Sequence, residues 1–591
     1  MSATPDKKRL DFSLLKKVMK LTVPYRSTFI TAAVLTLIIA PLGPYRSFLI
    51  QKMVDDHIAK FDLEGLTWLA IIVFVILFAE ATLQYFFTWI SNQLGQNIIR
   101  DLRVRVFKHI TSFRLHYFDT NPIGTSTTRT INDLETMNSV FSEGIITITA
   151  DFLTLILVLG FMLYTSWKLT LVCLITAPFL VIASYIFKEK VKGSFQEVRS
   201  EVARMNAFLQ ERISGMKTVQ IFNAEQQELE KFQSINKSLT KANVDGIFYY
   251  AVFYPVVEIL SAAALGLMVW YGAGGVIRSE ITLGTLVVFP VYIAMFFRPI
   301  RMLADKFNTL QMGLVAAERV FKILDDEENI EPSGALKINR LDGILEFEKV
   351  DFSYIPDTPI LKNVSFRLNP QDTLAIVGST GSGKTTIVSL MNRFYEINSG
   401  SIKINGQDIR QLDLASLRSR IAIVLQDVFL FSGTVLENIT LRDSNLSREA
   451  VIAAAKMIGA HDFIEKLPGG YDYQVMERGA TLSMGQRQLI SFVRALVFDP
   501  DILILDEATS SIDPETESVI QYAIEQLIAK RTSIIIAHRL TTIRHATNIM
   551  VMDKGEVKEF GKHDELLSIE NGYYKELYEM QFLNLYNETL S

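Results

Sequence analysis

The chain has 591 residues, of which 49% are apolar, and its formal net charge is −5. Its mean hydropathy is positive, which is unusual for a soluble protein of this length and indicates a membrane domain. No segment is basic enough to indicate a nucleic-acid-binding surface. Cys173 is the only cysteine, which excludes an internal disulfide and a cysteine metal cluster.

The N-terminal segment, residues 1–26, combines a basic start with an amphipathic stretch at 12–21. No short apolar core with a small-residue cleavage site follows it, so we expect no cleaved signal peptide. The lysines on the polar side of the stretch favour an interfacial helix on the cytoplasmic face of a membrane.

Six apolar runs each reach the roughly 20 residues that a helix needs to cross a bilayer. Helices in the interior of soluble proteins are usually shorter, so the runs predict six transmembrane helices, with a tight turn at 165–167 between the third and the fourth. The runs lie at residues 27–50, 66–89, 145–166, 168–188, 247–273 and 281–304.

Two long segments between the runs, 91–144 and 188–246, are rich in lysine and arginine, whereas the opposite connections are short or acidic. The positive-inside rule therefore predicts a multi-pass protein of the cell (plasma or inner) membrane with both long segments and both termini in the cytoplasm. Much of each segment lacks turn residues, and 205–221 reads as one continuous helix. We expect long helices that extend from the membrane into the cytoplasm and return.

The pattern changes after residue 304, where hydropathy falls, and short strands begin to alternate with helices from residue 343. This change predicts a transmembrane domain over 27–317, a linker over 318–342 and a second domain of α/β type over 343–591.

A phosphate-binding loop lies between a predicted strand at 373–377 and a predicted helix at 386–394. It has the full G-x-x-x-x-G-K-[ST] pattern, whose glycines let backbone N–H groups surround phosphate oxygens at a helix N-terminus. Lys384 is expected to reach the β- and γ-phosphates of ATP, and Thr385 to bind Mg²⁺. The predicted ATP-binding residues here are Gly378, Ser379, Thr380, Gly381, Ser382, Gly383, Lys384, Thr385 and Thr386.

Two further predicted strands end in candidate catalytic residues. Strand 502–505 ends in Asp506 and Glu507. Asp506 is expected to bind Mg²⁺, and Glu507 is expected to act as the general base for the attacking water. Strand 533–537 ends in His538, which we expect to contact the γ-phosphate.

Residues 482–488 read Leu-Ser-Met-Gly-Gln-Arg-Gln. Together with the loop, the acid pair and the six runs, they resemble the ATP-binding cassette signature, and nearly the whole chain resembles an ABC exporter half-transporter of the multidrug or lipid type. The resemblance implies an all-α six-helix membrane domain and an α/β P-loop cassette, in the type IV ABC exporter architecture. It also implies ATP and Mg²⁺ as cofactors and an ATPase coupled to transmembrane movement.

The resemblance assigns roles to further residues. Tyr354 would stack on adenine, and Gln426 would contact Mg²⁺ and sense the membrane domain. The signature residues would face the ATP held by a second half-transporter, and Asp513 would lie in the loop along the dimer interface. Segments 118–124 and 224–232 fall where the family has its two coupling helices. The signature residues are Ser483, Met484, Gly485 and Gln486.

Met484 departs from the usual Leu-Ser-Gly-Gly-Gln signature, in which a glycine follows the serine. Ser483 and Gly485 supply most of the expected phosphate contact, so we expect hydrolysis to survive. Because Glu507 and His538 are kept, the chain suits either a homodimer or the competent half of a heterodimer.

The expected mechanism is alternating access, in which two cassettes close on two ATP molecules and hydrolysis separates them. Its substrate would be an amphiphilic drug or lipid. The substrate class stays open at this point. Glu80, Asp151 and Glu258 would form an acidic lining for cationic amphiphiles, or Arg46 would meet an anionic lipid head group, or the charged residues of the runs pair with one another or extend to the membrane interface. They are Arg46, Glu80, Asp151, Glu258, Arg298 and Arg301.

Other classes explain fewer of these features. A soluble cassette protein of DNA repair or translation would lack the six runs, and importers usually keep membrane and cassette parts on separate chains. A peptide exporter with its own protease would need a Cys/His domain before the first run, and a regulatory channel would not require Glu507.

Overall fold

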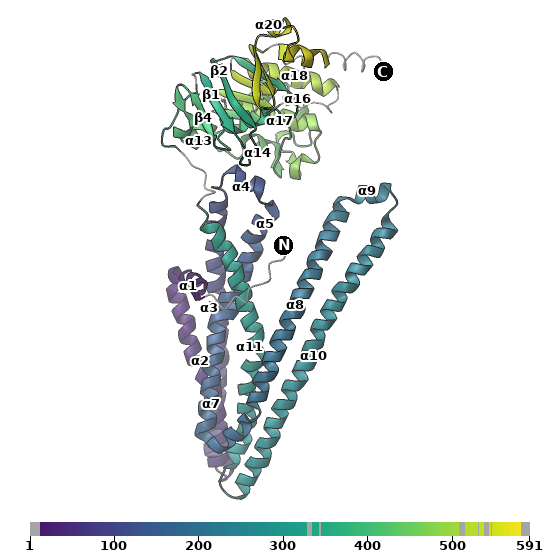
Figure 1. The fold of residues 1–591 in the computed structure, drawn as a ribbon. Helices are drawn as coiled ribbons and strands as arrows, with labels where there is room; N and C mark the ends of the chain where they lie inside the picture. Colours follow the sequence, from purple (N-terminus) through teal and green to yellow (C-terminus); the bar gives the residue numbers. More distant parts are fainter. Residues whose placement is uncertain are drawn as a thin grey trace. The chain divides into compact units, whose positions relative to one another are not determined.

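The computed structural model describes residues 12–327, 334–341, 344–506, 514–529, 531–536, 543–544 and 546–580. The chain divides into two compact units (Figure 1). Unit 1 comprises residues 1–111 and 121–327, and unit 2 comprises residues 112–120 and 328–591. A short piece of the first long polar segment therefore belongs to the same unit as the C-terminal domain.

Unit 1 is built from helices. Its α-helices are α1 (Phe12–Lys20), α2 (Arg26–Lys52), α3 (Leu63–Ile110), α5 (Ile123–Thr128), α6 (Leu134–Ser139), α7 (Ile145–Leu174), α8 (Ala177–Ser214), α9 (Met216–Ile221), α10 (Glu225–Ile277) and α11 (Leu283–Leu324). A 3₁₀ turn at Val23–Tyr25 and π-helical segments at Met53–Ile58, Arg129–Asp133 and Val140–Gly144 connect several of them.

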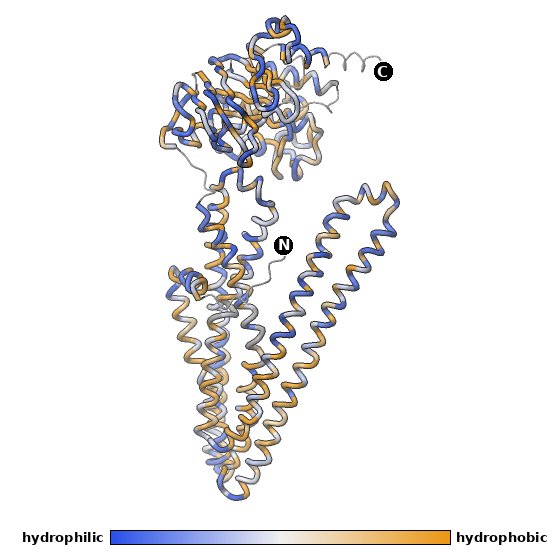
Figure 2. Tube along the Cα trace, viewed as in Figure 1, coloured by the Kyte–Doolittle hydropathy of each residue, from blue (hydrophilic) through white to orange (hydrophobic). Residues whose placement is uncertain are grey.

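Among the described residues, five helices are long and apolar enough to cross a membrane, and they correspond to five of the six predicted runs. Figure 2 shows apolar residues concentrated along the parts of these helices that lie together, whereas α8 and α10 continue into more polar turns. The candidate spans are Val23–Ile58, Leu63–Ile110, Ile146–Leu174, Glu225–Ile277 and Leu283–Ile300.

The remaining predicted run, 168–188, which is the fourth along the chain, is not one helix but is divided between the end of α7 and the start of α8. Ser166 has extended backbone (φ −160°, ψ 103°), so α7 breaks at the predicted turn. A second break follows at 175–176, because Pro178 lies in the first turn of α8 and has no N–H to continue a helix from α7. The hydroxyl of Thr176 donates to the carbonyl of Cys173 at this break.

The long helices α8 and α10 lie side by side and are joined at their polar ends by α9 (Figure 1). The prediction of one continuous helix over 205–221 is wrong, because α8 ends at Ser214 and Gly215 separates it from α9. The N–H of Gly215 donates to the carbonyl of Glu211 over 2.9 Å, as at a helix C-terminus. Segment 224–232 falls on the first turns of α10, so the short connecting helix precedes it.

Unit 2 contains two main sheets. A mixed sheet has the order β12-β11-β3-β10-β9-β6, and an antiparallel sheet has the order β2-β1-β4-β5. The strands are β1 (Leu345–Phe352), β2 (Leu361–Leu368), β3 (Thr373–Gly378), β4 (Ser399–Ile404), β5 (Gln407–Asp408), β6 (Ile421–Val424), β9 (Ile502–Asp506), β10 (Thr532–Ile536), β11 (Asn548–Asp553) and β12 (Glu556–Gly561), with a small pair β7 (Gly433–Thr434) and β8 (Gln474–Val475).

The helices of unit 2 are mostly short, and one of them, α4, comes from the N-terminal half of the chain. They are α4 (Leu115–Thr120), α12 (Lys384–Met391), α13 (Leu414–Arg418), α14 (Val435–Thr440), α15 (Arg448–Met457), α16 (His461–Glu465), α17 (Met484–Val497), α18 (Pro514–Ile528) and α20 (His563–Leu567).

Two hydrophobic cores lie on opposite faces of the six-stranded sheet. Leu374 and Ile376 of β3 belong to the core shared with the antiparallel sheet and α12. Ala375 and Val377 belong to the other core, which includes α15, α17 and α18. Side chains that alternate along a strand point to opposite faces, so a buried strand supplies both cores. This packing makes β3 a rigid support for the loop that follows it.

Phe492 tests the second core, because it is only 1% exposed on α17. We expect Phe492→Ala to lower the free energy of unfolding of the cassette by about 3–5 kcal/mol, since burial is lost and a cavity remains. Met457→Ala is the control, because Met457 is 52% exposed. Thermal unfolding of the full chain in neutral detergent measures both, and equal midpoints for the two variants would contradict the packing described here.

Candidate functional site

Five strands of the six-stranded sheet are parallel, and four of them, β3, β10, β9 and β6, precede predicted site residues at one edge. β10 pairs with β3 and with β9, and β9 pairs with β6. The register places Ile536 beside both Ile376 and Asp506. Residues that follow these strands therefore gather at a single edge, which is where open α/β sheets bind ligands.

The predicted phosphate loop connects β3 to α12 at this edge. Gly381 (φ +82°) and Gly383 (φ +102°) have left-handed backbone, which glycine adopts most readily. A Cβ atom at position 383 would lie 2.6 Å from Cδ2 of Leu361, whereas a Cβ atom at position 381 would meet nothing within 4 Å. The loop thus leaves open space beside the N-terminus of α12, whose first N–H groups have no partners within the helix.

Lys384 is buried at the start of α12. Its Nζ atom donates to the carbonyl of Gly378 (2.8 Å) and to that of Ser379 (2.9 Å). Burial lowers the pKa of Lys384, and the nearby Asp506 carboxylate acts in the opposite direction. The loop also contains the buried hydroxyl of Ser382, which has no hydrogen-bond partner among the described residues. Together, a cation and an unsatisfied hydroxyl suit an anionic ligand.

Three oxygen-bearing side chains accompany the loop. Asp506 is the last residue of β9 and is half-buried, Thr385 is exposed on the first turn of α12, and Gln426 is exposed just after β6. No described residue hydrogen-bonds the hydroxyl of Thr385. Carboxylate, hydroxyl and amide oxygens are the donors that Mg²⁺ takes beside phosphates.

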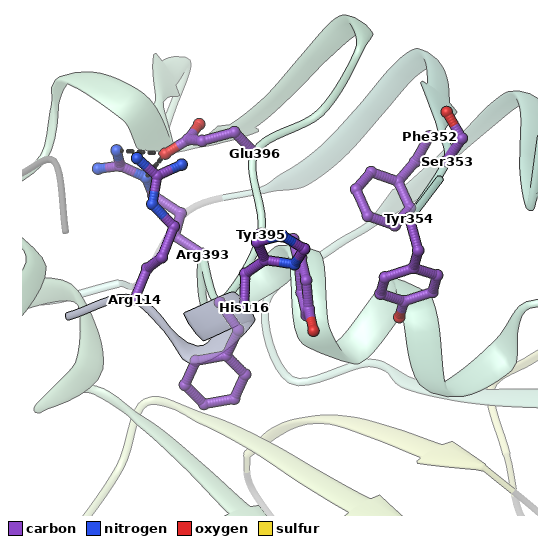
Figure 3. Close-up of a pocket in the computed structure, with 9 residues that line it drawn as sticks. Arg114, His116, Phe352, Ser353, Tyr354, Arg393, Tyr395 and Glu396 are labelled. Atoms are coloured by element: carbon purple, nitrogen blue, oxygen red, sulfur yellow. Dashed lines mark hydrogen bonds and ion pairs between the residues drawn. The ribbon is translucent and has the colours of Figure 1, made fainter. Parts of the chain in front are cut away.

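Tyr354 lies in a cluster of aromatic rings that the sequence did not predict. Its ring is perpendicular to that of Tyr395 at 4.8 Å, and its hydroxyl donates to Thr386 Oγ1 over 3.2 Å. The hydroxyl of Tyr395 hydrogen-bonds Asp119 of α4, and His116 of α4 lies edge-on to the same ring. In Figure 3 the ring of Tyr395 lies between α4 and Tyr354.

A cavity of about 190 Å³ opens beside these rings. Arg114, just before α4, and His116 of α4 line it, together with residues 352–354 and 393–396. α4 is thus in contact with the neighbourhood of Tyr354. Tyr395 was missed because it belongs to no recognisable motif and its partner Asp119 is 276 positions away in the chain.

The signature residues form the N-terminus of α17. Ser483 caps the helix: its hydroxyl accepts from the N–H of Gln486 (3.2 Å), and the Gln486 side chain accepts from the N–H of Ser483 (3.0 Å). Gly485 is buried, Met484 is half-buried and Ser483 is exposed. Among the described residues, no hydrogen bond or ion pair joins this turn to the phosphate loop of the same chain.

Glu507, Asp513 and His538 lie outside the described residues. Glu507 directly follows the end of β9, and His538 comes two residues after the end of β10. Asp513 directly precedes α18.

Comparison with known proteins identifies the family. The family model of the ABC transporter transmembrane region matches residues 29–300, and that of the ABC transporter matches residues 361–510. The uncharacterized ABC transporter ATP-binding protein YknV of Bacillus subtilis (strain 168) is 39% identical over 584 residues, which cover 97% of this chain and 96% of the relative.

This chain belongs to the ABC transporter family. An ATP-dependent lipid A-core flippase of Syntrophus aciditrophicus (strain SB) is 35% identical over 570 residues, which cover 96% of this chain and 94% of the flippase. A putative multidrug export ATP-binding/permease protein, YgaD of Bacillus subtilis (strain 168), is 34% identical over 579 residues, covering 97% and 100%. The prediction of an ATP-hydrolysing transporter with a helical membrane domain and an α/β nucleotide-binding domain is confirmed.

The residues present in the transporter fit Mg-ATP. The open loop beside α12, the buried Lys384 and the orphaned hydroxyl of Ser382 suit the phosphates, and the oxygens of Thr385 and Asp506 suit the metal ion. Mg²⁺, when bound, would neutralise charge on the phosphate oxygens.

The membrane unit of the transporter has its own cavity, of about 640 Å³, between α2, α3, α7 and α11. Its lining combines apolar side chains such as Ile39 and Leu77 with five ionisable ones. Of the alternatives that the sequence left open, the structure favours pairing at this cavity: Glu80 forms an ion pair with Arg46, and Asp151 forms one with Lys306, so both carboxylates line the cavity as members of ion pairs. Glu258 is not among the lining residues.

Gly381→Ala separates ATP binding from backbone strain. Gly406, in the turn between β4 and β5, has a similar φ (+75°) and equally open space, so Gly406→Ala is a matched control. We expect both to lose roughly 1–2 kcal/mol of stability from the left-handed backbone. Only Gly381→Ala should weaken binding of Mg-ATP, by about tenfold or more, because its methyl group enters the loop. Isothermal titration of the full chain measures this, and equal affinities for both variants would contradict the assignment of the loop.

Proposed function

We propose that this transporter exports an amphiphilic molecule, a drug or a lipid, from the cytoplasm or the inner leaflet. The observation that carries the proposal is the fusion, in one chain, of a nucleotide-binding edge to a helical membrane unit with a cavity that is both apolar and charged. Relatives named as a lipid A-core flippase and a putative multidrug export protein support export of amphiphiles.

The orientation follows from charge. The long segments 91–144 and 188–246 are basic, whereas the connection after α2 contains Asp55 and Asp56. The positive-inside rule supports a cell (plasma or inner) membrane protein with both termini in the cytoplasm. The cassette then meets cytoplasmic ATP.

The strand edge supports the proposed roles of the residues that the structure describes there, and Glu507 and His538 are proposed from their positions just after β9 and β10. Lys384 and the N–H groups of the loop hold the phosphates, and Thr385, Gln426 and Asp506 supply oxygens to Mg²⁺. Tyr354 offers its ring to adenine. Glu507 orients and deprotonates the attacking water, and His538 contacts the γ-phosphate.

A second half-transporter completes the site. The hydroxyl of Ser483 and the N-terminus of α17 are presented at the surface and make no described bond to their own phosphate loop. A helix N-terminus with a serine cap suits a phosphate, which here belongs to the nucleotide on the opposite cassette, with Asp513 along the interface. Closure of two cassettes on ATP and their separation after hydrolysis would alternate the access of the membrane cavity. The chain suits a homodimer or the competent half of a heterodimer.

Glu507→Gln tests the general base. We expect turnover of ATP to fall by roughly 10²–10⁴-fold, the usual contribution of such a group, with ATP binding retained because the amide has the same shape. Glu525→Gln, an exposed glutamate of α18, is the control and should keep the wild-type rate. Phosphate release by the purified full chain in liposomes measures both, and near-normal turnover of Glu507→Gln would remove the assignment.

Disulfide trapping tests the dimer. With the buried Cys173 replaced by alanine, the pair Thr380→Cys and Ser483→Cys should cross-link two copies in the presence of Mg-ATP and Glu507→Gln, giving a species of twice the chain mass. Thr380→Cys with Met457→Cys, an exposed site on α15, should not cross-link. An intrachain disulfide would contradict the shared site. The absence of any cross-link, with ATP bound, would contradict the homodimer.

A further inference from the structure

Two ion pairs join four of the five described ionisable residues that line the membrane cavity. Nη1 of Arg46 lies 3.2 Å from Oε2 of Glu80, which joins α2 to α3. Lys306 pairs with Asp151, which joins α11 to α7. The four side chains are between 22% and 28% exposed, so both pairs are largely removed from solvent. Neither carboxylate is available to a cationic ligand unless its pair is broken, which would leave a cation uncompensated in apolar surroundings.

Arg298 is the fifth ionisable residue of the cavity lining. It lies on α11, its side chain is exposed, and it makes no ion pair with a residue that the structure describes. The described lining therefore contains three cations and two carboxylates, and one positive charge is not compensated. Ionisable groups at membrane depth are costly and tend to face a cavity where they serve a function.

The surroundings of Arg298 are those of an amphiphile site. Pro299 and Met302 of the same helix line the cavity beside it, and Ile39 and Leu77 line it from α2 and α3. An apolar chain can lie against these side chains while its polar end remains at the guanidinium. The planar guanidinium donates paired hydrogen bonds to carboxylate and phosphate oxygens. A cationic ammonium head group has no acceptor atom, so it cannot receive these hydrogen bonds.

We propose that this cavity selects amphiphiles with one anionic head group, and that Arg298 binds that head group. The proposal rests on the proposed function, in which the cavity holds the exported molecule, and it names the charge class of the substrate. The anionic group belongs either to a membrane phospholipid or to a free amphiphile such as a fatty acid, since both present the same oxygens to Arg298.

Direct binding tests the charge class without hydrolysis. Oleate, oleylamine and oleyl alcohol have the same chain length and differ in head-group charge. The full chain, purified in neutral detergent without nucleotide, should bind oleate at least about tenfold more tightly than the other two. Arg298→Gln should abolish this preference, and Arg298→Glu should reverse it in favour of oleylamine. A reversal cannot result from misfolding, which would weaken all three.

Two control variants separate Arg298 from charge in general. Arg278→Gln removes an exposed arginine that pairs with Glu280 outside the cavity, and it should keep the preference for oleate. Arg46→Glu with Glu80→Arg exchanges the partners of one pair and keeps the net charge of the lining, so the preference should remain. Loss of the preference in either control, or its retention in Arg298→Gln, would overturn the proposal.

Liposomes distinguish the two sources of the anionic group. ATP hydrolysis is compared in phosphatidylcholine alone, with added phosphatidylglycerol and with added oleate, each relative to the basal rate of the same variant. Stimulation by phosphatidylglycerol indicates a phospholipid, stimulation by oleate alone indicates a free amphiphile, and both support the proposal if Arg298→Gln removes them. Preferential stimulation by oleylamine would overturn it. A chain that binds oleate through Arg298 but shows no ATP hydrolysis dependent on Glu507 would contradict the proposed function and leave the charge assignment intact.

Discussion

The parallel pairing of β3, β10, β9 and β6 is the interaction on which the nucleotide site depends. Each strand contributes little chemistry by itself, but their shared direction brings the loop after Gly378, the carboxylate of Asp506 and the residues after Val424 to one edge. The register is held by cores on both faces of the sheet, to which alternate residues of β3 contribute. A slip of one residue would exchange the two faces, so the packing also determines the alignment of the site.

Charge in apolar surroundings is the corresponding constraint in the membrane unit. An isolated ion there is costly, and the structure meets the cost by pairing Arg46 with Glu80 and Lys306 with Asp151 between neighbouring helices. The same pairs connect α2 to α3 and α7 to α11, so they contribute to the walls of the cavity as well as to its charge. Among the described ionisable residues of the cavity lining, Arg298 is the exception, which is why the proposed selectivity is assigned to it.

The aromatic contact of α4 connects the two ends of the chain. Residues 112–120 belong to the polar segment between the first membrane helices, yet they pack in the same unit as the cassette. Asp119 holds the hydroxyl of Tyr395, and the ring of Tyr395 contacts that of Tyr354. The environment of Tyr354 therefore includes residues from the N-terminal half of the chain, which pack in the same unit as the cassette.

Local sequence patterns were sufficient to predict the family, the two kinds of domain and the residues of the phosphate loop. Glycine spacing, a lysine and strands that end in acids are local patterns whose chemistry allows few alternatives. The sequence also located five of the six apolar runs as single helices, because length and hydropathy suffice for that. The break at Ser166 was predicted as a turn. The breaks at 175–176 and at Gly215 were not, since they depend on how each helix packs. The pairing of charges in the cavity and the contact between Tyr395 and Asp119 became apparent only from the folded chain. Those contacts join residues far apart in the chain, and no local sequence pattern indicates that such residues lie close together in space.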